Sequence, residues 1–347
     1  MTDVHVLEAT AADARETLAS AGTVRGSGAQ ERPRFELFHA AASICSQKVR
    51  AVLAHHGIRY REHSLNIFAG DTYLPGYVRL RMLGCESYGG ALVSEHSGST
   101  SVAAGGCDGA VVPTLVDWEE RTVIVDSKRI CVHFDNQVAD MAKLRPDVLA
   151  EGIDRDLDVV DHIPNYQMLM GRPKNAAEGA QTRDGIGRAL SLKKIAWCDR
   201  YLSEHPDDPK LVEAYTAKRA KEFSAAKRLF SPDAMEVASH RIEAALGELE
   251  RRLSAKSTRW LHGEFITMAD LFWGIELVRM ENTGAGKAWQ DGRMPDVADY
   301  ASATKSIPAI GWPNWAKTCS DGSWTFCDPA CRWSCSGNFR TWPPLRR

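Results

Sequence analysis

The stretch Phe35–Arg50 constrains the fold more than any other part of the chain, because a short apolar strand leads directly into a helix that carries Ser43 and Cys45 near its start. A cysteine in the first turn of a helix faces unpaired backbone N–H groups and the positive end of the helix dipole, and both favour the thiolate. Cys45 is therefore a candidate nucleophile, and the alternative is an ordinary buried cysteine. Lys48 stands where a C-x-x-C motif would have its second cysteine. A mixed disulfide on Cys45 would therefore need an external thiol to resolve it.

Two further signals follow downstream. Pro113 lies within the apolar run Val111–Val116. Because proline has no N–H to donate to a neighbouring strand, we expect Pro113 to lie at the start or edge of its strand. A cis Val112–Pro113 bond would offer the backbone of Val112 to an extended peptide, whereas the alternative is a plain turn. Asp126 and Ser127 open an apolar-periodic segment, which predicts a helix whose first N–H groups could receive a carboxylate. The alternative there is a plain helix cap.

The second half of the chain is predicted to be helical. Thr267 and Asp270 have capping-box spacing before an apolar run, which indicates the start of a buried core helix. The apolar periodicity predicts helices over these ranges: Asp154–Leu169, Gly187–Leu202, Leu211–Leu229, Pro232–Ser254 and Thr267–Met280.

Composition excludes several classes of function. A formal net charge of -2 gives no basic field for nucleic acid, so no nucleic-acid partner is expected. No apolar run approaches the roughly 20 residues that a membrane span needs, and the first residues lack the basic and apolar regions of a signal peptide. Nine cysteines without a framework of close pairs fit a reducing compartment. We therefore expect a cytoplasmic protein with no membrane partner.

These patterns divide the chain into segments. We expect residues 1–31 to form a flexible N-terminal arm, mostly loose with room for one short helix. Residues 32–140 would form an α/β domain with a Gly/Ser-rich insertion over 83–110. We expect this insertion to be a surface loop that either covers the active site as a lid or has no role there. Residues 150–310 would form an all-helical domain, and 311–347 an atypical tail.

The tail is rich in tryptophan and cysteine. It holds five of the ten tryptophans and four of the nine cysteines, without helical periodicity. The most specific interpretation of these cysteines is a four-cysteine zinc site. However, the tail has no C-x-x-C motif, and no histidine follows His262. We therefore predict no metal site, and we interpret the tail as sequence under no folding constraint, with a late reading-frame change as the hypothesis for its origin.

Taken together and in this order, the motifs resemble the glutathione transferase superfamily. Within it, the chain is most similar to the reductive dehalogenases of chlorinated hydroquinones, in particular those acting on 2,5-dichlorohydroquinone. The motifs that carry the resemblance are Pro33–Arg50, Tyr77–Arg81, Val111–Asp117, Asp126–Cys131, Leu211–Lys218 and Ala269–Trp273.

The resemblance implies the transferase fold, with an N-terminal thioredoxin-like α/β domain that binds glutathione and a following all-α helical bundle. It places glutathione along Val112, Pro113, Asp126 and Ser127. It also implies a reaction in which glutathione displaces chloride from a chlorinated hydroquinone substrate. Cys45 then takes the glutathionyl group as a mixed disulfide, and a second glutathione frees the enzyme. Two glutathione molecules are consumed per turnover, and a homodimer is left open.

Several alternatives stay open at this stage. Ser43 is either a helix cap or the group that activates glutathione, and the interpretation leans towards activation or a shared role. Tyr166, in a helix with Met168 and Met170, is more typical of core than of a substrate pocket. Rival functions are β-aryl ether cleavage, maleylacetoacetate-type isomerisation, and a non-catalytic binding protein with the same fold.

Overall fold

The computed structural model describes residues 2–26, 32–170 and 182–310. Residues 1–310 form one compact unit. Expectations placed on the tail from Gly311 lie outside the described residues.

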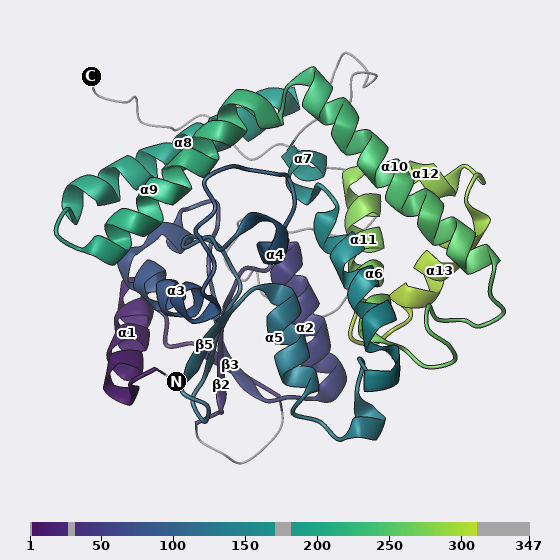
Figure 1. The fold of residues 1–347 in the computed structure, drawn as a ribbon, viewed down its shortest axis with the longest axis horizontal. Helices are drawn as coiled ribbons and strands as arrows, with labels where there is room; N and C mark the ends of the chain where they lie inside the picture. Colours follow the sequence, from purple (N-terminus) through teal and green to yellow (C-terminus); the bar gives the residue numbers. More distant parts are fainter. Residues whose placement is uncertain (1, 27–31, 171–181, 311–347) are drawn as a thin grey trace. The chain divides into compact units, whose positions relative to one another are not determined.

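The chain alternates strands and helices at first and is helical afterwards (Figure 1). The strands are β1 (Thr23–Arg25), β2 (Phe35–His39), β3 (Tyr60–Ser64), β4 (Thr114–Asp117) and β5 (Thr122–Val125). The helices of the first half are α1 (Val4–Thr17), α2 (Ile44–His56), α3 (Pro75–Tyr88), α4 (Val102–Gly105) and α5 (Ser127–Asp135). The helices of the second half are α6 (Ala150–His162), α7 (Asn165–Met170), α8 (Thr182–Glu204), α9 (Pro209–Ser224), α10 (Pro232–Ser254), α11 (Met268–Thr283), α12 (Lys287–Gln290) and α13 (Pro295–Lys305). Short 3-10 turns occupy Asp71–Tyr73, Asp140–Ala142 and Asp147–Leu149, and a π-helical turn occupies Ala225–Leu229.

The five strands form one mixed sheet in the order β1-β3-β2-β4-β5. β2 runs parallel to β3 and antiparallel to β4, so that Phe35 is opposite Tyr60 on one side and Asp117 on the other. β4 and β5 are joined as an antiparallel pair. A parallel pair joined through a helix, followed by an antiparallel hairpin, is the thioredoxin-like arrangement that the sequence predicts, and the fold class is confirmed.

Helices cover both faces of the sheet, because alternate strand residues point to opposite sides. Phe38, Val116 and Val123 belong to one buried cluster with residues of α1 and α3. On the other face, the ring of Phe35 meets that of Phe134 in α5 at 4.9 Å. α2 packs beside α5 on that face and carries Cys45 at its first turn (Figure 1).

The arm over residues 1–31 was expected to be mostly loose with room for one short helix; the part that the structure describes holds such a helix, α1, but it is packed and not loose. α1 is capped by Asp3, whose carboxylate accepts hydrogen bonds from His5 and Val6 N–H. Its buried face packs against α3. β1 then pairs antiparallel with β3 and extends the sheet by one strand. The signal was weak because the buried face of α1 is largely alanine, which resembles the composition of a loose segment.

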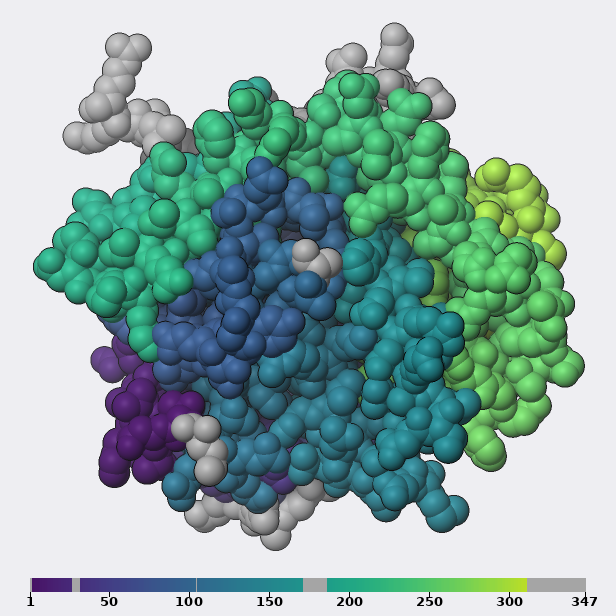
Figure 2. Space-filling model, in the orientation of Figure 1, coloured from purple at the N-terminus to yellow at the C-terminus, as the bar shows by residue number. Residues whose placement is uncertain are grey.

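The segment predicted as an insertion over 83–110 is more integrated than expected. Residues 83–88 complete α3, and the inserted loop begins after Gly89, which ends the helix at a φ of 73°. Leu92 and Cys107 then pair as an isolated bridge. Figure 2 shows this blue stretch at the surface beside the green helices α8 and α9.

The helical half follows the predicted periodicity with one interruption. The helix predicted over Asp154–Leu169 is broken into α6 and α7 at Pro164, since proline cannot supply the N–H that a continuous helix requires. The capping box before α11 is confirmed: the Thr267 N–H donates to the carboxylate of Asp270 at 2.8 Å. Asp270 also accepts from Tyr300 Oη at 2.7 Å, which ties α11 to α13.

Candidate active site

Cys45 and Ser43 lie where the sequence places them, at the start of α2. Ser43 is the N-cap, and its hydroxyl accepts a hydrogen bond from the N–H of Ser46 at 3.3 Å. The hydroxyl therefore acts as a helix cap in this structure. Cys45 is partly exposed, two residues further on.

Ser127 faces Cys45 across the site. The Ser127 side chain acts on the Cys45 thiol and lowers its pKa, so the start of α5 lies beside the start of α2. Asp126 caps α5 by accepting the N–H of Arg129 at 3.0 Å, and its backbone adopts a φ of 80°. Two of the predicted glutathione-binding residues are thereby brought against the candidate nucleophile.

The Val112–Pro113 peptide bond is cis. Its surroundings hold it in place: Arg81 of α3 donates to the carbonyl oxygen of Pro113 and to that of Asp108, both at 2.5 Å. Tyr77 Oη donates to the carbonyl of Val111 at 2.6 Å. The strap before β4 is thus fixed by two buried side chains of one helix.

Sequence reasoning missed the charged groups that surround Cys45. Lys48, one turn beyond Cys45, forms a fully buried ion pair with Asp161 of α6 at 2.7 Å. Glu276 of α11 is also fully buried and accepts from Asn165 at 3.0 Å. Lys48 could have been suspected, because it shares the helical face of Cys45. Asp161 and Glu276 come from helices over a hundred residues away and carry no local signal.

Arg279 fixes the loop between β2 and α2. Its guanidinium donates to the carbonyl of Ala42 at 2.8 Å and to the side-chain oxygen of Gln47 at 3.0 Å. Because α11 is a core helix, this contact ties the backbone that precedes Cys45 to the helical half.

The electrostatics of the site work against a free thiolate. Burial raises the pKa of the Cys45 thiol, and this outweighs the opposing effects of Lys48 and of Ser127. Burial likewise raises the pKa of Glu276 to about 7, although Lys48 opposes it. The pKa of Asp126 is raised by burial and by Asp161. The thiolate of Cys45 is therefore less favoured than its position in the first turn of a helix would suggest.

One group with the chemistry of metal ligands lies elsewhere. Ligand atoms of Asp117, Glu120 and His133 lie within 4.8 Å of one another. Asp117 is already engaged, since both its oxygens accept from Arg34, at 2.9 and 2.7 Å. A bidentate arginine competes directly with a cation for that carboxylate.

Tyr166 differs from the core aromatic expected from the sequence. It is half-buried, its hydroxyl accepts from Lys194 at 3.2 Å, and its ring stacks on His96 with centroids 5.0 Å apart. Its ring also meets that of Phe230 edge to face with centroids 5.5 Å apart, so polar and apolar groups both surround it.

Known proteins are similar to this chain in sequence and in fold. The model of the glutathione S-transferase N-terminal domain matches residues 42–137, which include α2, the cis-proline strap and the start of α5. Over 289 residues the chain is 33% identical to the 2,5-dichlorohydroquinone reductive dechlorinase of Sphingobium indicum. The match covers 81% of this chain and 84% of that protein. The chain belongs to the glutathione transferase superfamily.

More distant similarities extend to other members of the fold. Human ganglioside-induced differentiation-associated protein 1-like 1 is 24% identical over 287 residues, which cover 78% of this chain and 70% of that protein. The solved structure of the β-etherase LigF from Sphingobium sp. strain SYK-6 matches with a TM-score of 0.50 at 14% identity, covering 80% of this chain and 97% of the other. That likeness concerns the fold.

None of the helices in the described ranges combines the length and apolar character that crossing a bilayer requires.

Proposed function

We propose that this protein is a glutathione-dependent reductive dehalogenase of chlorinated hydroquinones. The observation that carries the proposal is the placement of Cys45: it lies in the first turn of α2, where Ser127 and the buried Lys48 both act to lower the pKa of its thiol. The 33% identity to a dichlorohydroquinone reductive dechlorinase supports the same chemistry.

Glutathione would lie along Val112 and Pro113, with one of its carboxylates at Asp126 and Ser127. A chlorinated hydroquinone first tautomerises to an enone-like ketone, whose ring carbon accepts the glutathione thiolate. The C–S bond forms, chloride leaves with the C–Cl bonding pair, and a glutathionyl hydroquinone results.

The thiolate of Cys45 then attacks the glutathione sulfur of this conjugate. An S–S bond forms on Cys45, the C–S bond breaks, and the ring carbon keeps the electron pair and takes a proton. A second glutathione attacks the mixed disulfide and leaves as oxidised glutathione, which restores Cys45. The ring gains two electrons and two glutathione thiols lose them, so the balance closes.

Lys48 has a defined part in this scheme. Its buried ammonium lowers the pKa of Cys45, against the larger effect of burial. When Cys45 loses its proton, the new negative charge lies beside a cation that Asp161 already orients. Lys48 is therefore a positioning and charge-stabilising residue for the sulfur.

The test is the stoichiometry of an anaerobic incubation with 2,5-dichlorohydroquinone and glutathione. We expect one chloride and one oxidised glutathione for each hydroquinone that loses chlorine. Chloride without oxidised glutathione would indicate simple conjugation. Neither product, together with turnover of a β-aryl ether or of maleylacetoacetate, would favour the rival enzymes of this fold.

A further inference from the structure

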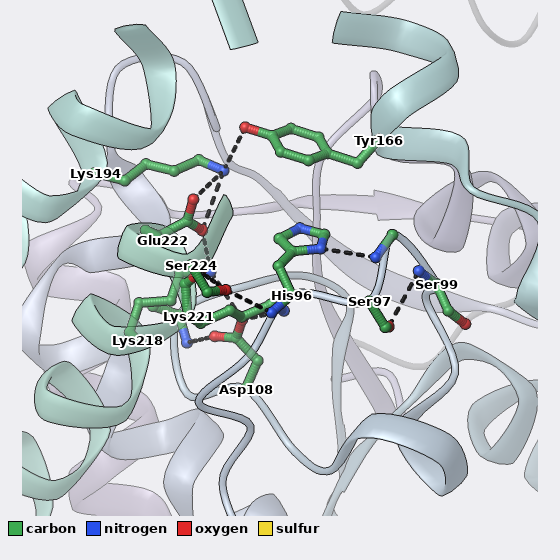
Figure 3. Close-up of polar contacts among 12 residues, drawn as sticks. His96, Ser97, Ser99, Asp108, Tyr166, Lys194, Lys218, Lys221, Glu222 and Ser224 are labelled. Carbon is green, nitrogen blue, oxygen red and sulfur yellow. Dashed lines mark hydrogen bonds and ion pairs between the residues drawn. The ribbon is translucent and has the colours of Figure 1, made fainter. Parts of the chain in front are cut away.

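A second concentration of buried charge lies between the α8–α9 pair and the inserted loop (Figure 3). Five side chains compose it, and we call them the lysine cluster: Asp108, Lys194, Lys218, Lys221 and Glu222. The dehalogenation scheme uses none of them.

The lysine cluster carries more positive than negative charge. Lys218 lies 2.8 Å from Asp108 and 3.0 Å from Glu222. Lys221 shares Asp108 at 2.8 Å, and Lys194 shares Glu222 at 3.3 Å. Three ammonium groups thus share two carboxylates. None of the three lysine side chains is more than 15% exposed to solvent. An unbalanced charge held away from water is costly unless something neutralises it.

Two neighbouring groups in the described part of the chain, Arg81 and His96, do not restore the balance. Arg81, fully buried beside Asp108, bonds to neutral oxygens: the carbonyls of Asp108 and Pro113 and the hydroxyl of Thr114. Burial holds the pKa of His96 well below its usual range, and Lys221 and Lys194 act in the same direction, so this imidazole is neutral.

Two tyrosine hydroxyls border the lysine cluster. Tyr73 is 1% exposed, and its hydroxyl has no hydrogen-bond partner among the residues that the structure describes. Lys218 Nζ lies 5.7 Å from the centre of the Tyr73 ring, and Glu222 and Asp108 are among the charges that act on the hydroxyl. Tyr166 accepts from Lys194, which leaves its own proton to donate (Figure 3). A buried donor without an acceptor is destabilising, because the group has lost its hydrogen bond to water.

The lysine cluster adjoins the Cys45 site through the inserted loop. At one end of this connection, the N–H of His96 donates to Ser224 Oγ at 2.8 Å, and Ser224 lies two residues after Glu222 of the lysine cluster. Three residues on, Ser99 Oγ donates to the carbonyl oxygen of Asp161 at 2.6 Å. The carboxylate of that aspartate binds Lys48, one turn beyond Cys45.

We propose that the lysine cluster, together with the Tyr73 and Tyr166 hydroxyls, is a binding subsite for an organic anion, either a phenolate or a carboxylate. Such an anion supplies the negative charge that three lysines and two carboxylates leave missing. It also supplies the acceptor that Tyr73 lacks. The phenolate of an aromatic substrate and a carboxylate of glutathione are the two sources next to this site. The subsite does not depend on the chemistry proposed for Cys45.

The test measures binding, not turnover. The probes are 2,6-dichloro-4-nitrophenolate, its uncharged methyl ether, and S-methylglutathione, which has carboxylates but no thiol. Dissociation constants are measured by calorimetry for the wild type, Lys194→Met and Lys221→Met. Lys305→Met is the matched control, since that lysine forms an exposed ion pair with Glu281.

We expect an anionic probe to lose roughly tenfold or more in affinity in both cluster variants and to bind the control normally, since each variant removes a charge-assisted contact. The methyl ether should bind all four proteins alike. Loss confined to the phenolate assigns the subsite to the aromatic ligand, and loss confined to S-methylglutathione assigns it to the tripeptide. Unchanged affinity for both anions in both variants overturns the proposal.

A second measurement covers variants that fail to fold. In wild-type protein, the phenolate should raise the melting temperature more than the methyl ether does at equal concentration. Equal shifts would contradict an anion subsite. Neither measurement involves turnover or a reaction of Cys45, so failure of the dehalogenation proposal leaves this result unaffected.

Discussion

The Cys45 site and the lysine cluster both contain buried charged groups, but they are built from different parts of the chain. The Cys45 site depends on backbone devices: a helix start, a cis peptide bond and a residue at positive φ. The lysine cluster depends on long side chains brought together from distant segments, such as Asp108 and Lys218, which are 110 positions apart. Backbone devices leave local motifs in a sequence, whereas side-chain clusters do not.

Their charge also differs. At the Cys45 site, Lys48 is matched by Asp161, and Glu276 has its pKa raised to about 7 by burial, so that it holds its proton through mildly acidic pH. In the lysine cluster, strong ion pairing keeps the pKa of Glu222 near 2 despite burial, with Lys194 and Lys218 as its main partners. The Cys45 site can accept a new negative charge on sulfur. The lysine cluster has one positive charge more than its two carboxylates balance.

This contrast explains what the sequence could and could not predict. The strand, thiol, proline strap and capping box were readable because each is set by residues within a few positions. The fixing of Ala42 by Arg279 was not readable, since it joins positions 237 apart. The sequence allowed one short helix in the first 31 residues, but alanines at 11 and 14 give a weak periodic signal and did not reveal that this helix packs against α3.

The largest effect should come from Cys45→Ser. We expect release of dechlorinated hydroquinone to fall by roughly a thousandfold or more, because the variant lacks the group that attacks the glutathionyl sulfur. Chloride release should continue and the glutathionyl hydroquinone should accumulate, as followed by chromatography. Cys198→Ala, which removes a buried thiol of α8, is the control. Normal product release by Cys45→Ser would remove the cysteine from the mechanism.

Asp108→Asn tests how much the carboxylates of the lysine cluster contribute to stability. Removing one of its two carboxylates leaves three buried ammonium groups with one partner, so we expect a loss of about 3–5 kcal/mol in the free energy of unfolding. Chemical denaturation measures it. Glu204→Gln, in an exposed pair with Arg200, should cost less than about 1 kcal/mol. If the two substitutions cost the same, the ion pairs of the lysine cluster do not contribute as the structure indicates.

Glu276 should make stability depend on pH. Its folded pKa of about 7 exceeds its ordinary value of 4.5. The folded protein therefore binds this proton more tightly than the unfolded chain, and stability falls as pH rises from 4.5 through 7. The full effect is at most about 3 kcal/mol. Across this range the melting temperature of Glu276→Gln should change less with pH than that of the wild type. Glu281→Gln on the same helix is the control, and identical slopes for wild type and Glu276→Gln would contradict the shift.

The smallest effects should come from Asp126 and Ser127. Replacing either with alanine should weaken glutathione binding, each lost contact being worth ~1–3 kcal/mol. Calorimetry of S-methylglutathione binding checks this without turnover. Asp126→Ala should also lower the melting temperature, because the carboxylate caps α5 through Arg129. An unchanged dissociation constant in both variants would exclude these residues from the glutathione site.

The most direct test of the central claim is mass spectrometry of the enzyme after it reacts with synthetic glutathionyl hydroquinone in the absence of free glutathione. We predict that one glutathione becomes disulfide-linked to the peptide that contains Cys45, with release of one equivalent of hydroquinone, and that added glutathione removes the adduct. The Cys45→Ser protein should carry no adduct. Hydroquinone release without an adduct on Cys45, or an adduct on another cysteine that forms at the same rate in Cys45→Ser, would contradict the mechanism.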